Sequence, residues 1–323
     1  MASWQSKFMT FTFRNKHLMQ GQWKMKTWDE NTSIPAFREL LEKGAEKAKL
    51  PKGVEAVPVK IDGLPAGLAA EWLQPTADAP IPMVEDAVIF YAHGGGYVSG
   101  SCSDHRVLVA KFVAVSGVRL LLFEYRLAPE NPFPAAMEDT LTAYRWLLTQ
   151  IKPSTRIIIA GESAGGGLCL AALLAIRETG LPIPAAGIAL SPWTDLKLTG
   201  ESHITRLKAS IDPPGMSKVC SRYYCGDNDP VNPWISPLYG DLHGLPPLLI
   251  DVGNDETLRD DSIMFAEKAR AAGVEVTLNV VEGQIHCYPL LADFIPESRQ
   301  AMAEICAFIR KHISLAAEPV FAG

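Results

Sequence analysis

The stretch that decides the fold is Arg156-Ile157-Ile158-Ile159-Ala160-Gly161-Glu162-Ser163-Ala164-Gly165. Its first half is a β-branched apolar run, which predicts a strand covered on both faces. Small residues around Ser163 permit a sharp turn, and the apolar run 168–174 that follows predicts a helix. A serine at the apex of such a strand–turn–helix unit is typical of a nucleophile held out into a pocket. The helix start behind it supplies free N–H groups that favour negative charge.

Strands and helices alternate on both sides of this unit. The apolar runs predict strands at 54–61, 68–73, 87–91, 118–123, 157–160, 187–190, 248–252 and 276–281. The spacing of apolar residues predicts helices at 35–44, 105–116, 135–150, 168–179, 258–272 and 298–314. After an opening antiparallel pair, this alternation predicts a mostly parallel α/β sheet with right-handed crossovers.

Composition narrows the class of protein. The 323 residues carry a formal charge of −6, which argues against a nucleic-acid partner or a polybasic membrane surface. We find no apolar run long enough to span a bilayer and no secretory signal, so the sequence predicts a cytoplasmic protein without a membrane partner. Six scattered cysteines are then expected to be free thiols, and no metal site is predicted.

A serine nucleophile needs a base and a group that orients the base. His286 follows the strand 276–281 and is the one histidine between His243 and His312 in the sequence, so it is the predicted base. Asp255 follows the strand 248–252 in a turn after Gly253 and is the predicted acid, with Glu256 as the next candidate. The carboxyl ends of parallel strands share one edge of a sheet, where open α/β sheets bind their ligands.

A glycine run follows the strand 87–91. His93-Gly94-Gly95-Gly96 offers backbone N–H groups without side chains in the way, as an oxyanion requires. Such a run pairs with the N–H that follows the nucleophile, here that of Ala164. The run lacks the lysine of a phosphate-binding P-loop, and no G-x-G-x-x-G follows a strand.

From about residue 54 to its end the chain resembles the hormone-sensitive-lipase group of carboxylesterases, within the α/β-hydrolase fold. The matching blocks, in the family's order, are 93–96, 125–136, 161–165 and 191–195. The resemblance implies Ser163 as nucleophile, Asp255 as acid and His286 as base. It also implies oxyanion amides at Gly95, Gly96 and Ala164, in a loop that contains His93 and is shaped by Gly94. Glu162 and Glu256-Thr257 depart from the usual pattern without removing a catalytic group.

The resemblance further implies an eight-stranded, mostly parallel twisted sheet with helices on both faces and a helical cap. The segment 198–237 has no clean periodicity and is too long for an ordinary connection. We therefore expect a cap segment at 1–50, core at 51–197, a cap insertion at 198–237 and core again at 238–323. The aromatic residues of the cap are candidates for lining the pocket or for packing cap on core: Trp4, Phe8, Trp23, Trp28, Tyr223, Tyr224 and Trp234.

These features predict a cofactor-free serine carboxylesterase that acts on short- to medium-chain esters through an acyl-enzyme. A lactone or arylamide hydrolase using the same triad is an alternative. A non-catalytic receptor is a second alternative, because plant gibberellin receptors resemble this family but lack the catalytic histidine, which is present here as His286. The expected partner is a small-molecule ester, and the resemblance also allows a homodimer.

Overall fold

The computed structural model describes residues 2–19, 21, 26–45, 48–291 and 295–313. Eight strands form one sheet in the order β1-β2-β4-β3-β5-β6-β7-β8. The strands are β1 (Val54–Val59), β2 (Ala70–Pro75), β3 (Ala87–Ala92), β4 (Arg119–Phe123), β5 (Arg156–Glu162), β6 (Ala186–Leu190), β7 (Leu248–Gly253) and β8 (Val276–Val281). Each lies where the sequence predicts a strand. The fold is the predicted α/β-hydrolase fold.

Helices connect and cover these strands. They are α1 (Trp4–Arg14), α2 (Lys16–Met19), α3 (Ile34–Ala45), α4 (Cys102–Ser116), α5 (Ala135–Gln150), α6 (Ala164–Glu178), α7 (Ser202–Thr205), α8 (Met216–Cys225), α9 (Arg259–Ala271) and α10 (Pro296–Ile313), with 3-10 turns η1 (Pro237–Tyr239) and η2 (Tyr288–Leu290). Helix α4 begins three residues before the predicted helix. The reason is a capping box, in which the side chains of Ser101 and Asp104 bond to each other's backbone N–H.

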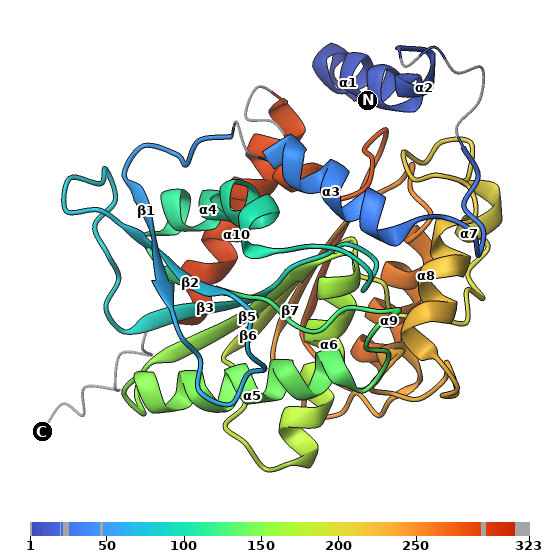
Figure 1. Cartoon of the computed structure of the whole chain (residues 1–323). Coiled ribbons are helices and arrows are strands. Elements are labelled where there is room, and N and C mark those ends of the chain that lie inside the picture. The colour runs from blue at the N-terminus through green and yellow to red at the C-terminus, as the bar shows by residue number, and fades with distance from the viewer. Residues whose placement is uncertain (1, 20, 22–25, 46–47, 292–294, 314–323) are drawn as a thin grey trace, which may run out of the picture.

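The sheet separates two apolar cores. Phe112 of α4 and Phe308 of α10 belong to the core on one face. Tyr144 of α5, Leu170 of α6 and Phe265 of α9 belong to the core on the other face. Figure 1 shows the same layers, with α4 and α10 on one side of the strands and α5 and α6 on the other. Burial on both faces explains why the central strands are continuous apolar runs.

The direction of the strands places the candidate site residues at one edge of the sheet. β1 and β2 pair antiparallel, and β2 is also antiparallel to β4. All later pairs are parallel, with Ala92 opposite Gly161 and Gly253 opposite Val281. The loops that follow β3, β5, β7 and β8 therefore leave from the same edge, and they carry the candidate residues predicted from the sequence.

Two parts of the chain lie over that edge. In Figure 1, α1, α2 and α3 lie above the carboxyl ends of the strands, and α7 and α8 lie beside them. These helices fall in the segments 1–50 and 198–237, which break the strand–helix alternation of the sequence. In the part of the chain that the structure describes, no helix meets the length and hydropathy needed to cross a membrane.

Candidate active site

Ser163 lies at the turn between β5, which ends at Glu162, and α6, which begins at Ala164. Its backbone has φ 56° and ψ −123°, a strained conformation for a residue with a side chain. The turn needs glycine on both sides. A Cβ on Gly161 would lie 2.5 Å from the carbonyl oxygen of Gly165, and one on Gly165 would lie 2.2 Å from that of Ala92. Backbone crowding thus fixes the serine hydroxyl outward.

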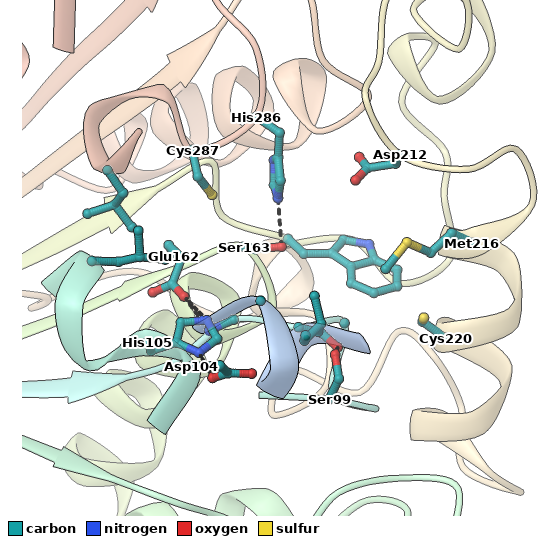
Figure 2. A pocket seen from close by; sticks show the side chains of 18 of the residues that line it. Ser99, Asp104, His105, Glu162, Ser163, Asp212, Met216, Cys220, His286 and Cys287 are labelled. Atoms are coloured by element: carbon teal, nitrogen blue, oxygen red, sulfur yellow. Dashed lines mark hydrogen bonds and ion pairs between the residues drawn. The ribbon is translucent and has the colours of Figure 1, made fainter. Parts of the chain in front are cut away.

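His286 connects this hydroxyl to a buried carboxylate. Its Nε2 lies 2.9 Å from Ser163 Oγ, and its Nδ1 lies 2.5 Å from Glu256 Oε2. Figure 2 shows the imidazole above Ser163, with the bond between them dashed. With Nδ1–H donated to the carboxylate, Nε2 is left free to accept the serine proton. The structure therefore brings Ser163 and His286 together as predicted.

The prediction that Asp255 orients His286 is wrong. Asp255 turns away from the imidazole and forms a 2.8 Å ion pair with Arg14 of α1. The neighbouring Glu256, the second candidate of the sequence analysis, takes the place behind His286. Consecutive residues of this turn point in different directions, so the choice between them depends on where His286 lies. The sequence places both side chains in the correct loop but does not specify that direction.

Glu256 is fully buried and held by further hydrogen bonds. Its Oε1 accepts from Ser191 Oγ at 2.8 Å and from the Gly253 N–H at 2.7 Å. Ser191 in turn accepts the N–H of Cys287 at 3.0 Å, which ties the histidine loop to the carboxylate. The sequence analysis gave Ser191 no role at the site. Only the convergence of the loops after β6, β7 and β8 reveals this function.

The pKa of His286 lies well above its ordinary value. Burial lowers the pKa of His286, but the interactions with the Cys287 and Glu256 side chains raise it by a larger amount. Burial raises the pKa of the Cys287 thiol itself, so the thiol is protonated at neutral pH. The carboxylate that contacts the imidazole is that of Glu256. A carboxylate in this position stabilises an imidazolium, as proton transfer from Ser163 requires.

The glycine loop after β3 lies against the serine. Gly94, Gly95 and Gly96 line the same cavity as Ser163. The N–H groups of Gly95, Gly96 and Ala164 donate to no acceptor within the described residues. The Gly94 N–H, by contrast, donates to Glu162 Oε1 at 2.5 Å. Three amides thus have no hydrogen-bond acceptor among the described residues, and the fourth anchors the loop.

His93 stabilises this loop through its contacts with Tyr125. Its ring stacks on Tyr125 with centroids 4.3 Å apart, and the Tyr125 hydroxyl donates to the His93 carbonyl oxygen at 2.7 Å. Burial, together with the nearby His105, lowers the pKa of His93 to about 4. The ring is therefore neutral at physiological pH, and its contacts are structural.

A second buried ionic cluster, which the sequence analysis did not identify, lies next to Ser163. His105 Nε2 lies 2.9 Å from Glu162 Oε1, and its Nδ1 contacts Asp104. Burial lowers the pKa of His105, but Glu162 and Asp104 raise it to about 10. The ring is thus an imidazolium between two carboxylates (Figure 2). Because Glu162 also holds the Gly94 N–H, this cluster positions the glycine loop.

The raised pKa of His105 predicts a pH-dependent stability. The contribution of the cluster is complete below about pH 6.5, the usual imidazole value, and is lost as pH rises through about 10. We expect His105→Gln to lower the free energy of unfolding by about 3–5 kcal/mol below pH 6.5, with a smaller difference toward pH 10. Chemical denaturation across this range measures the effect. A difference that stays constant with pH would contradict the assignment, and His243→Gln, at an exposed histidine, is the control.

The cavity in front of Ser163 has a volume of roughly 490 Å³. The residues that line it include Phe37 and Leu41 of α3, Leu108 of α4, Trp193 and Met216. The wall is mainly apolar, with the polar groups of the Ser163–His286 pair at its base. This size and lining are typical of a pocket for a small organic ligand.

The aromatic residues proposed for the pocket do not line it. Trp23 lies outside the described residues, and the cavity wall contains none of the other six. Trp28 packs edge-on against Phe37 with centroids 4.8 Å apart, and Tyr224 stacks on Tyr97 at 3.7 Å. Tyr224 thus packs the segment 198–237, expected to be a cap insertion, on the segment expected to be core, which was the alternative in the sequence analysis. Trp28 and Phe37 both belong to the segment 1–50, so their contact lies within the expected cap. Trp4 and Phe8 point outward, because α1 contacts the protein through its other face.

Comparison with known proteins agrees with this geometry. The family model for the alpha/beta hydrolase fold matches residues 89–290. An acetyl-hydrolase of Streptomyces hygroscopicus is 42% identical over 75% of this chain and 79% of its own. An esterase of Acinetobacter venetianus is 34% identical over 86% of this chain and 89% of its own.

Solved structures extend the match to almost the whole chain. A crystal structure of an esterase from the bacterial hormone-sensitive lipase family is 38% identical, with a TM-score of 0.84 over 97% of this chain and 100% of that one. The esterase EstE5, in a crystal soaked with p-nitrophenyl butyrate, is 39% identical, with the same score and coverage. The chain therefore belongs to the alpha/beta hydrolase family and, within it, to the hormone-sensitive-lipase group of esterases.

Proposed function

We propose that the protein is a serine carboxylesterase in which Ser163, His286 and Glu256 form the triad. The observation that carries this proposal is the unbroken chain from hydroxyl through imidazole to carboxylate, with bonds of 2.9 and 2.5 Å. Esterases and acetyl-hydrolases among its relatives support the same reaction class. Asp255, the acid expected from the sequence, is not part of this triad.

The reaction follows from the positions of these groups. Ser163 Oγ attacks the ester carbonyl carbon while His286 Nε2 takes its proton, and Glu256 stabilises the imidazolium. The N–H groups of Gly95, Gly96 and Ala164 hold the oxyanion that forms. His286 then gives its proton to the departing alcohol as the C–O bond breaks. Water, deprotonated by His286, attacks the acyl-enzyme and releases the acid and the free serine.

The cap would determine which esters enter. We propose that residues 1–50 and 198–237 form it, because α3 and α8 supply Phe37, Leu41 and Met216 to the cavity wall. A cavity of roughly 490 Å³ has room for a small ester, but a long acyl chain would extend beyond it. Six free thiols in the structure support a reducing, cytoplasmic location.

A series of p-nitrophenyl esters from acetate to palmitate, assayed without added metal or cofactor, tests the function. We expect kcat/KM to be highest for the short and medium acyl chains, because these fit within the cavity. Absence of hydrolysis across the whole series would overturn the esterase proposal. Faster turnover of a lactone or an arylamide than of every ester would favour those alternatives, which the same triad could serve.

A further inference from the structure

The first helix of the chain, α1, is amphipathic, but its apolar face is exposed to solvent and its polar face is buried. Trp4, Phe8 and Phe11 share one face of α1, at spacings of four and three residues. This face points to solvent, with relative exposures of 73%, 65% and 66%. The face toward the protein carries Ser6 and Thr10, which are buried. An amphipathic helix that packs on a core normally buries the apolar side instead.

Polar bonds hold α1 in this orientation. Ser6 Oγ accepts a hydrogen bond of 2.8 Å from Nε2 of Gln284, a residue that lies two positions before His286 in the chain. Ser3, the N-cap of the helix, donates its N–H and hydroxyl to Glu297 at 2.5 and 2.8 Å. At the other end, Arg14 donates to the Ala209 carbonyl oxygen at 2.6 Å and pairs with Asp255. The aromatic face therefore points outward because specific contacts fix the opposite face.

The charge of this segment differs from that of the whole chain. Residues 1–28 contain four lysines and one arginine and no acidic residue, although the formal net charge of the protein is −6. Lys7 is exposed and borders the aromatic face, three residues from Trp4 and four from Phe11. Aromatic side chains beside basic ones are typical of helices that lie in the interface of an anionic bilayer.

We propose that the outward face of α1, formed by Trp4, Phe8 and Phe11 and bordered by Lys7, docks on an anionic lipid surface. A second copy of the chain is a poorer occupant, because pairing two such faces would bring two basic segments together. The net charge, read over the whole chain, led to the expectation of no membrane partner. The uneven distribution of that charge leads to the opposite conclusion for this surface.

Co-sedimentation of the full-length protein with vesicles tests the proposal. The vesicles contain phosphatidylcholine alone or an equal mixture with phosphatidylglycerol. We expect binding to the mixed vesicles at low ionic strength, and release by salt because screening weakens the attraction. Binding that is absent, or equal for the two compositions, would overturn the proposal. The assay measures binding to vesicles and not ester hydrolysis, so a lack of binding would not contradict the esterase proposal.

Matched variants locate the surface. We expect Trp4→Ser/Phe8→Ser to weaken binding to mixed vesicles about tenfold or more, because two aromatic rings no longer enter the lipid. Met83→Ser/Ile183→Ser removes two exposed apolar side chains outside α1 and should bind like the wild type. Lys7→Glu should weaken binding to mixed vesicles without altering the aromatic face, so it tests the proposal even if the double variant misfolds.

Three results with the variants would also overturn the inference. The first is wild-type binding by the α1 double variant, and the second is unchanged binding by Lys7→Glu. The third is self-association in analytical ultracentrifugation that the α1 double variant abolishes while vesicles bind no wild-type protein, which would assign this face to a second copy. Because Trp4 and Phe8 lie outside the catalytic cavity, p-nitrophenyl acetate hydrolysis should stay at the wild-type rate in the α1 variant and confirms its folding.

Discussion

Ser163→Ala is expected to lower kcat for p-nitrophenyl butyrate by about a million-fold. The substitution removes the atom that forms the acyl-enzyme, and neither His286 nor the free amides can replace it. The cavity and the oxyanion donors persist, so a small rate above that of water is expected to remain. Initial rates with purified protein measure the loss, and a thermal melt shows that the variant is folded.

Covalent labelling gives this prediction a second readout. A fluorophosphonate should label wild-type protein at Ser163, identified by peptide mass spectrometry, and should not label Ser163→Ala. Ser103→Ala removes an exposed serine on α4 and should keep both labelling and activity. Wild-type turnover by Ser163→Ala, or labelling at a different serine, would refute the proposed nucleophile.

Glu256→Gln is expected to lower kcat about a thousand- to ten-thousand-fold. An amide nearly preserves the shape of the side chain but removes the charge that stabilises the imidazolium of His286. Asp255→Asn changes the preceding residue in the same way and should leave kcat near that of the wild type. It breaks only the partly exposed ion pair with Arg14, which contributes about 0–1 kcal/mol to stability. The reverse ranking of the two variants would restore Asp255 as the acid.

The pH dependence separates the two carboxylates further. His286 acts as a base only when neutral, so kcat/KM should rise with pH as the imidazolium loses its proton. The raised pKa of His286 places this rise above the usual imidazole value of about 6.5. Removing the Glu256 charge lowers that pKa, so the rise should move to lower pH in Glu256→Gln. In Asp255→Asn the profile should not move.

Local pattern predicted most of the sheet. The central strands are buried on both faces, so their apolar runs are continuous and easily identified. The turn at Ser163 was equally predictable, because Gly161 is required by a close backbone contact with Gly165 of the same strand–turn–helix unit. The sequence predicted the first residues of the helices less exactly. The capping box at Ser101 moved the start of α4, since it depends on side-chain bonds and not on apolar spacing.

The limits of the sequence appear where a side chain's direction depends on distant segments. The choice between Asp255 and Glu256 depended on the position of His286, thirty residues further along the chain from Glu256. The cluster of Asp104, His105 and Glu162 joins a helix to a strand end that is far from it in sequence. Likewise, Trp4 and Phe8 have the spacing of pocket or core residues, but the bonds of Ser6 and Arg14 turn them outward.

The sequence by itself predicted the strand–helix alternation, the pairing of Ser163 with His286 and the position of the glycine loop. Each of these depends on residue types that act within a short stretch of chain. Only the tertiary structure decided which carboxylate orients His286, what holds the glycine loop and which face of α1 meets solvent. In each of these cases the deciding contact joins segments that are far apart in the chain. Local sequence pattern contains no information about which distant segments come into contact.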